Sequence, residues 1–297
     1  MSLAAASPRF GRVALIGKLR SPEIAESLRT LKAFLERRGC EVLIERETGA
    51  DIGARGVGYD AIGSRAELAI IVGGDGTMLA AARNLVGHGV PVTGVNQGRV
   101  GFMTDIGHAN MLEGIGAILD GRCSMEDRSL LDCEIVRSGQ TLLRTIALNE
   151  AVLGKGSQGR LIEFELTIDG EFVYKLRGDA MIVATPTGST AYALSANGPI
   201  LHPAVPAFAL VPLAPHTLSA RPVSVSDRSV IEITIVRADD ARAHFDGFAL
   251  ADMAEGDRLV LRRSSEVVRF VHPPAYRYFA TLREKLRWSE SIEKERA

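Results

Sequence analysis

The features that are scarce in this sequence exclude several classes of protein. Only three cysteines occur, Cys40, Cys123 and Cys133, and no two are closely spaced, so neither a disulfide framework nor a zinc site is expected. The formal net charge is −1, which gives no reason to expect binding to nucleic acid or to an anionic membrane. No apolar run approaches the roughly 20 residues of a membrane-spanning helix, and the first ten residues lack the features of a signal peptide. We therefore expect a cytoplasmic protein.

Length and composition favour more than one folding unit. With 297 residues, 46% of them hydrophobic, the chain can bury one large core or two moderate ones, and the usual domain size favours two. In the first half, strands expected at 13–16, 42–44, 68–72 and 92–95 alternate with helical patterns. Such alternation predicts a mostly parallel, doubly wound sheet. The segment from Gly49 to Ser64 is rich in glycine and is expected to be a mobile loop.

After about Asp127 the pattern becomes that of a β protein. Apolar and polar residues alternate from Ile162 to Ile168, and Asp169-Gly170 supplies a hairpin turn. Further strands are expected at 130–136, 180–184, 208–213, 231–235, 259–261 and 267–271, which predicts an antiparallel β-sandwich. We predict an α/β domain at 1–127, a β-sandwich domain at 128–272, and a helical tail at 273–297 that packs on the first domain.

The segment Gly73-Gly74-Asp75-Gly76-Thr77 joins a buried strand to a helix and carries one carboxylate. Its glycines can take positive φ and leave room for a ligand, and a helix N-terminus offers N–H groups to an anion. Asp75 would repel a phosphate unless it binds Mg²⁺, takes a proton or contacts a sugar hydroxyl. The placement predicts a reactive site, and the simpler alternative is a tight turn in which Asp75 caps the helix.

Two segments of the second half also carry polar groups in unusual places. From Ala184 to Ser195, four hydroxyl side chains and a glycine precede Tyr192, and they either cap a turn or donate to phosphate and ribose oxygens. Tyr192 would stack on a purine or pack in the core. Asn149 and Glu150 interrupt an apolar run, and neighbours on a strand face opposite sides. One of the pair would need a ligand as its partner, unless the strand lies at a wet edge.

Taken together, the ordered motifs resemble those of the ATP-dependent NAD kinases, which phosphorylate NAD to NADP. The matching segments are Gly73–Thr77, Asn96–Phe102, Asn149-Glu150, Arg177–Asp179, Thr185–Ser195 and the tail Phe279–Trp288. They extend over most of the chain in the family's order. The family fold, an α/β domain followed by a β-sandwich domain with a returning C-terminal segment, agrees with the periodicity. Lipid kinases and phosphofructokinases share the Gly-Gly-Asp-Gly signature more distantly, but they lack the segment Thr185–Ser195.

The resemblance implies a role for each matching residue. Asp75 would accept the proton of the adenosine ribose 2′-hydroxyl as it attacks the γ-phosphorus of ATP. Gly74 and Gly76 would let the phosphates approach the backbone, while Mg²⁺ on the phosphates would neutralise charge. A homodimer or homotetramer is implied, with sites shared between subunits. The residues implied to hold NAD are Asn149, Glu150, Arg160, Arg177, Asp179, Thr190, Ala191, Tyr192, Ser195 and Asp246.

Some positions depart from the family pattern. Phe248 stands where many members carry a polar residue that contacts NAD, so Asp246 is carried over only weakly, and Asp246-Gly247 is also an ordinary hairpin turn. Arg160 replaces a common histidine, and Val100 replaces a common leucine. The six histidines show no metal spacing and are expected at the surface or in packing, so no protein metal site is predicted.

Two other functions remain open from the sequence. A lipid kinase would need affinity for lipid, for which there is no basic amphipathic helix, and an NADP(H)-binding sensor would keep the pocket without the chemistry. The intact Asp75 argues against the sensor. The sequence leaves open whether ATP or polyphosphate is the donor, whether NADH is accepted beside NAD, whether the oligomer is a dimer or a tetramer, and whether activity is regulated allosterically.

Overall fold

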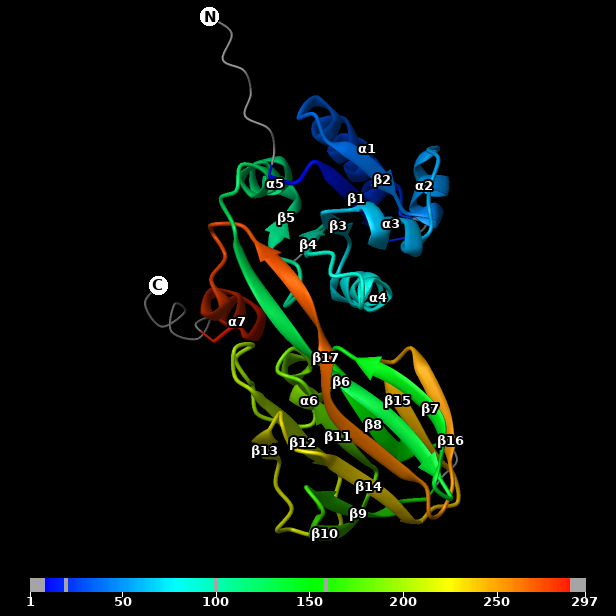
Figure 1. The fold of residues 1–297 in the computed structure, drawn as a ribbon. Helices are drawn as coiled ribbons and strands as arrows, with labels where there is room; N and C mark the ends of the chain where they lie inside the picture. Colours follow the sequence, from blue (N-terminus) through cyan, green and yellow to red (C-terminus); the bar gives the residue numbers. More distant parts are fainter. Residues whose placement is uncertain (1–8, 19–20, 99–100, 158–159, 289–297) are drawn as a thin grey trace, which may run out of the picture. The chain divides into compact units, whose positions relative to one another are not determined.

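The computed structural model describes residues 9–18, 21–98, 101–157 and 160–288. The chain forms two compact units, Met1–Asp127 with Val268–Ala297, and Arg128–Val267. Two strands run from one unit into the other, β6 (Ser124–Arg137) and β17 (Arg258–His272). Figure 1 shows the first unit mainly in blue and cyan and the second in green, yellow and orange.

The first unit contains the predicted parallel sheet. Its strands follow the order β2-β1-β3-β4, all parallel, and Phe270 at the end of β17 pairs with Val92 of β4. The strands are β1 (Arg12–Gly17), β2 (Glu41–Ile44), β3 (Leu68–Val72), β4 (Val92–Asn96) and β5 (Ile106–Gly107). The helices are α1 (Pro22–Arg37), α2 (Arg46–Ile52), α3 (Tyr59–Arg65), α4 (Asp75–Leu85), α5 (Met111–Leu119) and α7 (Tyr278–Leu286).

An apolar stripe fixes α1 against the sheet. Ile24, Leu28, Leu31 and Leu35 recur at helical spacing and are all buried, as the sequence predicted. They share a core with residues of β1 and β3. Each buried leucine or isoleucine contributes about 1.5–3 kcal/mol through loss of apolar surface to water. This core determines where the carboxyl ends of the parallel strands lie.

The prediction of a mobile loop from Gly49 to Ser64 was wrong, because this segment contains most of α2 and α3. The Glu45 carboxylate accepts hydrogen bonds from the Glu47 and Thr48 amides and so caps α2. A Cβ on Gly49 would lie 2.8 Å from the Ala54 carbonyl oxygen. Glycine is therefore needed there for close backbone packing, a requirement that sequence composition does not distinguish from mobility.

The second unit is a two-sheet sandwich, which confirms the predicted fold class. One sheet follows the order β10-β9-β14-β17-β6-β7, and the other follows β13-β12-β11-β8-β15-β16. The strands that complete these sheets are β7 (Gln140–Ala147), β8 (Glu150–Lys155), β9 (Ile162–Ile168), β10 (Glu171–Gly178), β11 (Ala180–Ala184), β12 (Ala207–Leu213), β13 (Val223–Ser226), β14 (Ile231–Arg237), β15 (Ala241–Phe245) and β16 (Ala249–Met253). A short helix, α6 (Tyr192–Ser195), interrupts the β pattern.

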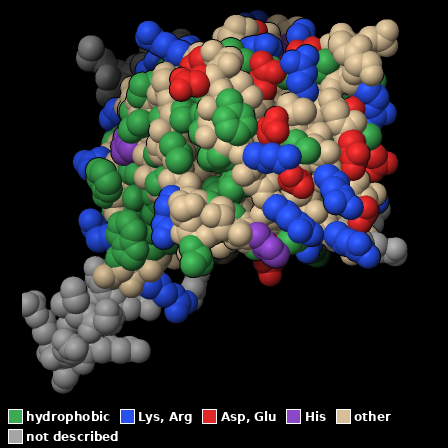
Figure 2. Space-filling view, turned by 90° about the horizontal axis from the view of Figure 1, so that it is seen from below, with side chains coloured by type: hydrophobic (Ala, Val, Ile, Leu, Met, Phe, Trp, Pro, Cys, Tyr) green, Lys and Arg blue, Asp and Glu red, His purple; other side chains and the backbone are tan. Residues whose placement is uncertain are grey.

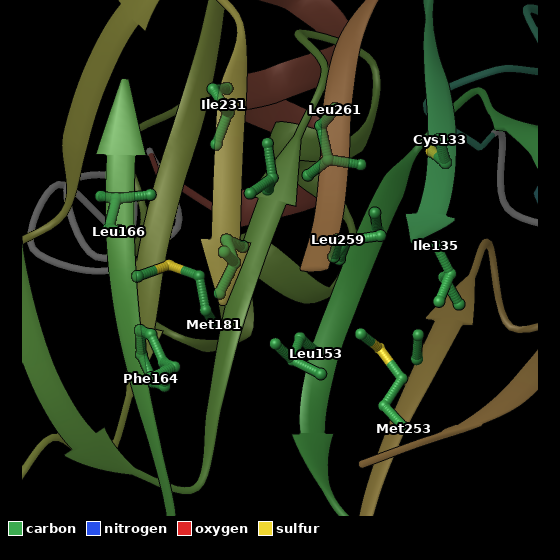
Figure 3. Close-up of a cluster of buried hydrophobic side chains, with 14 of the residues drawn as sticks. Cys133, Ile135, Leu153, Phe164, Leu166, Met181, Ile231, Met253, Leu259 and Leu261 are labelled. Carbon is green, nitrogen blue, oxygen red and sulfur yellow. The ribbon is translucent and has the colours of Figure 1, made fainter. Parts of the chain in front are cut away.

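The inward faces of the two sheets form one hydrophobic core. Phe164, Ile231 and Leu259 come from the first sheet, and Leu153 and Met181 come from the second (Figure 3). All five are at most 1% exposed. The alternation of apolar and polar residues therefore identified the buried face of β9 and β14 correctly.

Hairpin turns and strand lengths show what local sequence does and does not encode. Asp169 and Gly170 both have positive φ and join β9 to β10, as predicted. The strands expected at 259–261 and 267–271 are instead parts of the single strand β17. The polar residues between them, Arg262 to Glu266, remain in the extended conformation because all are exposed except the half-buried Ser264, so no polar group has to be buried there.

The C-terminal helix α7 belongs to the first unit, which confirms the expected return of the chain. Its Leu282 is 2% exposed.

In the space-filling view, basic and acidic side chains are interspersed over one part of the face, and hydrophobic side chains gather on another part (Figure 2). This face therefore carries no broad patch of one charge, in keeping with the net charge of −1.

Candidate active site

Asp75 is the first residue of α4 and lies directly beyond the buried strand β3. Gly74 occupies the N-cap position and no side chain caps the helix, so the carboxylate lies where the helix dipole favours negative charge. Its two oxygens accept hydrogen bonds from the Phe102 amide at 2.9 Å and the Met103 amide at 3.0 Å. Asp75 therefore has a fixed orientation, and it does not act as a simple side-chain cap.

The backbone around Asp75 requires a glycine at position 101. A Cβ on Gly101 would lie 1.9 Å from Oδ1 of Asp75, which is impossible without displacing the carboxylate. Thr104 Oγ1 accepts hydrogen bonds from the Gly101 amide at 2.9 Å and from Asn96 Nδ2 at 3.0 Å. The sequence motif Asn96–Phe102 thus supports Asp75, although Arg99 and Val100 of that motif lie outside the described residues. The motif did not extend to Met103 and Thr104, and their spacing from Asp75 gave no signal.

The glycines on either side of Asp75 differ from expectation in one respect. Neither Gly73 nor Gly74 has positive φ, so conformational strain does not explain them. A Cβ on Gly73 would lie 2.6 Å from Thr77 Oγ1, so Gly73 is needed for packing. By contrast, among the described residues, a Cβ built on Gly74 or Gly76 would meet no atom within 4 Å beyond its neighbours along the chain. These two positions leave backbone accessible to a ligand.

Gly76 and Thr77 also line a cavity of about 690 Å³ in the first unit. The carboxyl end of β1 contributes Gly17 and Lys18, and the start of α2 contributes Glu45 and Arg46. The cavity thus lies at the carboxyl end of a parallel sheet, where α/β proteins commonly bind ligands. Nothing in the sequence pattern indicated Lys18 or Arg46 as lining residues.

In the second unit, Glu150, Asp179 and Tyr192 line one cavity of about 530 Å³. They come from β8, from the residue between β10 and β11, and from α6. The cavity is also lined by Lys155, whose Nζ lies 2.7 Å from Oδ1 of Asp179. The sequence gave no signal for Lys155, because an ion pair between residues 24 apart depends on strand pairing, here of Gly154 with Ala180.

Glu150 has the most unusual environment of the predicted site residues. It is 8% exposed, and Oε2 has no hydrogen-bond partner among the described residues. Burial, and next the negative charge of Asp246, raise the pKa of Glu150 to about 7, while a hydrogen bond from the Tyr192 amide opposes the shift. The proposed wet edge is wrong, because β8 lies between β11 and β15. Asn149 precedes the strand, so the two polar residues are not strand neighbours.

Asp246 is a structural residue of the turn between β15 and β16. Asp246 and Gly247 both have positive φ, which confirms the hairpin turn. The buried Asp246 carboxylate accepts hydrogen bonds from the amides of Leu148, Asn149 and Glu150 at 2.8, 2.7 and 3.0 Å. It thereby holds the start of β8. A direct contact between Asp246 and a ligand stays a prediction.

The hydroxyl groups before Tyr192 are bonded within the chain. Thr185 donates to the Leu148 carbonyl, Ser189 donates to Pro186, and Thr190 donates to Thr187. A Cβ on Gly188 would lie 2.0 Å from the Asn149 carbonyl oxygen, so this glycine admits backbone of the chain itself. The capped-turn interpretation therefore holds for these hydroxyls. Tyr192 is 42% exposed, so the alternative of a core tyrosine is wrong.

The remaining predicted residues separate into two groups. Thr190, Ala191 and Ser195 lie in or beside the turn and α6, with Ser195 exposed at the end of that helix. Arg160 and Arg177 line a different, smaller cavity of about 100 Å³ together with Arg237 and Asp239. The structure therefore does not bring these two arginines into the cavity of Glu150.

The described part of the chain carries neither a metal-binding cluster nor a membrane-spanning helix. No group of three or more histidine, cysteine or acidic side chains there could hold a metal ion. Among the same residues, no helix is both long and apolar enough to cross a membrane.

Comparison with known proteins agrees with the order of the motifs. A family model of the ATP-NAD kinase N-terminal domain matches residues 13–123, and one of the C-terminal domain matches residues 148–273. The NAD kinase of Aromatoleum aromaticum is 56% identical over 95% of this chain and 96% of that protein. The NAD kinase of an Azoarcus species is 54% identical over 95% of this chain and 98% of that protein.

Solved structures show the same fold. The crystal structure of an NAD kinase from Archaeoglobus fulgidus in complex with ATP has a TM-score of 0.71 and 26% identity, over 92% of this chain and 98% of that one. Yeast NADH kinase complexed with NADH has a TM-score of 0.87 at 23% identity, over 96% of this chain and 93% of that one, which is a likeness of fold. With both family models matched and relatives above 50% identity along nearly its whole length, the chain belongs to the ATP-NAD kinase family.

Proposed function

We propose that this chain is an NAD kinase, a phosphotransferase that moves the γ-phosphate of ATP to the 2′-hydroxyl of the adenosine ribose of NAD to give NADP. Family membership and relatives named NAD kinase support the proposal. The observation that carries it is the setting of Asp75, a carboxylate held by two backbone amides at a helix N-terminus beside two unobstructed glycines.

In the proposed reaction, Asp75 accepts the proton of the 2′-hydroxyl as that oxygen attacks the γ-phosphorus in line. The Phe102 and Met103 amides keep the carboxylate pointed in one direction. This orientation supplies part of the rate, because a base contributes only when it lies within hydrogen-bond reach of its proton. Gly74 and Gly76 give the phosphates access to backbone N–H groups.

The cavity of Glu150, Asp179 and Tyr192 is the proposed site for the adenosine part of NAD. Tyr192 offers an exposed ring for stacking on adenine. The unpartnered Oε2 of Glu150 and the carboxylate of Asp179 offer hydrogen-bonding groups to base and ribose. Asn149, Thr190, Ala191 and Asp246 lie next to or near lining residues in the sequence, and Ser195 ends the helix of Tyr192, so these five are proposed contacts. Arg160 and Arg177, in their separate cavity, are proposed to reach NAD held by a neighbouring subunit.

A divalent cation, Mg²⁺ or another, is proposed to accompany ATP. Mg²⁺ is commonly bound through substrate phosphates and one or two carboxylates, and it would neutralise charge that develops on the phosphates. Asp75 fits as one such ligand, although both its oxygens already accept amide hydrogens. Its first role is therefore proposed as the base and its second, if any, as a metal ligand. A cytoplasmic location and a homo-oligomeric state complete the proposal.

A coupled NADP assay tests this function. Purified protein with NAD and Mg²⁺ is assayed with ATP, other nucleoside triphosphates and polyphosphate, and with NADH in place of NAD. NADP formation is expected with ATP. Absence of product with every donor would refute the kinase.

Asp75→Asn gives the sharpest variant. Loss of the base is expected to lower kcat by about 10²–10⁴-fold, because asparagine keeps the shape but its amide nitrogen can neither take the proton nor accept the second backbone amide hydrogen. NAD binding measured by calorimetry is expected to stay within about twofold. A binding sensor would instead show no turnover in either protein, and a lipid kinase would phosphorylate lipid vesicles in place of NAD.

A further inference from the structure

The amides that hold Asp75 lie on a short connection between two strands. Phe102 and Met103 precede β5, a strand of only two residues that pairs with Val95 and Asn96 of β4. So short a strand contributes few backbone hydrogen bonds. The orientation of Asp75 therefore depends on what else holds residues 101–105.

One support comes from Thr104, which is fully buried. Its hydroxyl bonds to Gly101 and Asn96, so it ties the connection to the end of β4. The Thr104 hydroxyl thus holds the end of the segment near Gly101. The other end, at Asp105, is held by a different residue.

That partner is His272, the last residue of β17. Its Nδ1 donates a hydrogen bond to Oδ2 of Asp105, and its Nε2 lies 3.3 Å from Oε2 of Glu126. The side chains of His272 and Asp105 are 3% and 5% exposed. The imidazole also stacks on Tyr276, with ring centroids 4.0 Å apart and planes 9° apart. The ring is thus held by the bond to Asp105 and by the stack on Tyr276, and the Glu126 carboxylate lies beside its other nitrogen.

Taking the proposed function as given, we propose that His272 is a positioning residue for the phosphoryl transfer. It holds Asp105, and through it the Met103 amide two residues earlier, which in turn orients the Asp75 carboxylate. A histidine that served only packing would need no buried carboxylate against Nδ1, and burying such polar groups costs free energy unless they are paired. The pairing fixes a segment whose precise placement matters for the base.

The two ring nitrogens give a matched pair of variants. The side-chain amide of asparagine occupies the position of Nδ1, and that of glutamine occupies the position of Nε2. His272→Asn can therefore keep the hydrogen bond to Asp105, whereas His272→Gln loses it. Both variants lose the stacking of the imidazole on Tyr276. We expect kcat of His272→Asn within about threefold of wild type, and kcat of His272→Gln lower by about 10–100-fold.

Michaelis constants for NAD and ATP are expected to change by less than about twofold in both variants, since neither removes a contact with substrate. His88→Asn, at an exposed histidine of the same unit, is expected to behave as wild type. Equal kcat in the asparagine and glutamine variants, or a change confined to KM, would overturn the proposal.

Asp105→Ala provides an independent route if His272→Gln does not fold. It should lower kcat as His272→Gln does, and a double variant should lose little more than either single one. A wild-type kcat for Asp105→Ala would contradict the assigned role.

Amide hydrogen exchange separates this proposal from the proposed function. Exchange of the Phe102 and Met103 amides is expected to accelerate about tenfold in His272→Gln and to stay near wild type in His272→Asn. Exchange in β3 should not change. This readout needs no turnover, so it remains decisive even if the wild-type protein forms no NADP, and unchanged exchange in His272→Gln would reject the positioning role.

Discussion

At the scale of the residue, Glu150 makes the stability of the second unit depend on pH. Its carboxyl group is nearly enclosed and lies near the Asp246 charge, and its pKa rises from 4.5 to about 7. Folding therefore takes up a proton between these two values, because the native state holds it more tightly than the unfolded chain. The native-state contribution is full below pH 4.5 and is lost as the pH rises to about 7.

For the wild-type protein, we expect the free energy of unfolding to fall by about 3 kcal/mol over this window from Glu150 alone. Glu150→Gln should remove that slope, because the amide does not titrate. Chemical denaturation between pH 4.5 and 8 measures the difference between the two proteins. Glu171→Gln, at an exposed glutamate, is the control, and a slope that persists in Glu150→Gln would contradict the assignment.

Gly101 provides a second test at this scale. Gly101→Ala places a methyl group 1.9 Å from Oδ1 of Asp75, so the carboxylate must move. A displacement of about 1 Å is enough to lower kcat by about 100-fold. Steady-state kinetics should show this loss. Gly116→Ala, in α5 with its nearest neighbour at 3.5 Å, should keep wild-type kcat and stability.

At the scale of the element, the turn between β15 and β16 organises the candidate NAD site. Three consecutive amides at the start of β8 donate to one carboxylate, that of Asp246. The Asp-Gly pair indicated the turn from sequence alone. It gave no indication that the carboxylate reaches a segment almost 100 residues earlier.

Asp246→Ala should destabilise the second unit by about 2–4 kcal/mol, because buried amides lose a charged acceptor. Thermal or chemical unfolding measures this. Asp169→Ala is the matched control, since Asp169 also has positive φ in a hairpin turn but accepts one hydrogen bond, from the exposed Val230 amide. A loss of stability as small as that of the control would contradict the conclusion that Asp246 holds the start of β8.

The elements of the first unit show which local sequence patterns are sufficient to predict a helix or a strand. Buried strands such as β3 and the amphipathic α1 followed from apolar periodicity. The helices between Gly49 and Ser64 did not, because Gly49 is required by a close approach of Ala54. Composition records glycine but not the neighbour that demands it.

At the scale of the whole molecule, the proposed sharing of sites between subunits can be tested by mixing variants. Arg177 and Glu150 of the same chain line different cavities. This separation agrees with the proposal that Arg177 contacts NAD bound to a neighbouring subunit. In a dimer of Asp75→Asn and Arg177→Ala chains, one of two sites would contain both native residues. Randomly mixed dimers should then recover about a quarter of wild-type activity at limiting NAD.

The experiment needs each variant alone as a control and a sedimentation measurement of the oligomer. Activity no higher than that of the Arg177→Ala protein at the same subunit concentration would show that Arg177 acts within its own chain. A monomer in sedimentation would exclude sharing altogether.

The sequence by itself determined the fold class, the hairpin turns and the motif that contains Asp75. These depend on neighbours along the chain, whose periodicity and turn chemistry are local. Tertiary structure decided the partners of those groups: the amides of Phe102 and Met103 on Asp75, the burial that raises the pKa of Glu150, and the bond from His272 to Asp105. Such contacts join residues far apart in the chain, so they exist only once strands and connections have packed together.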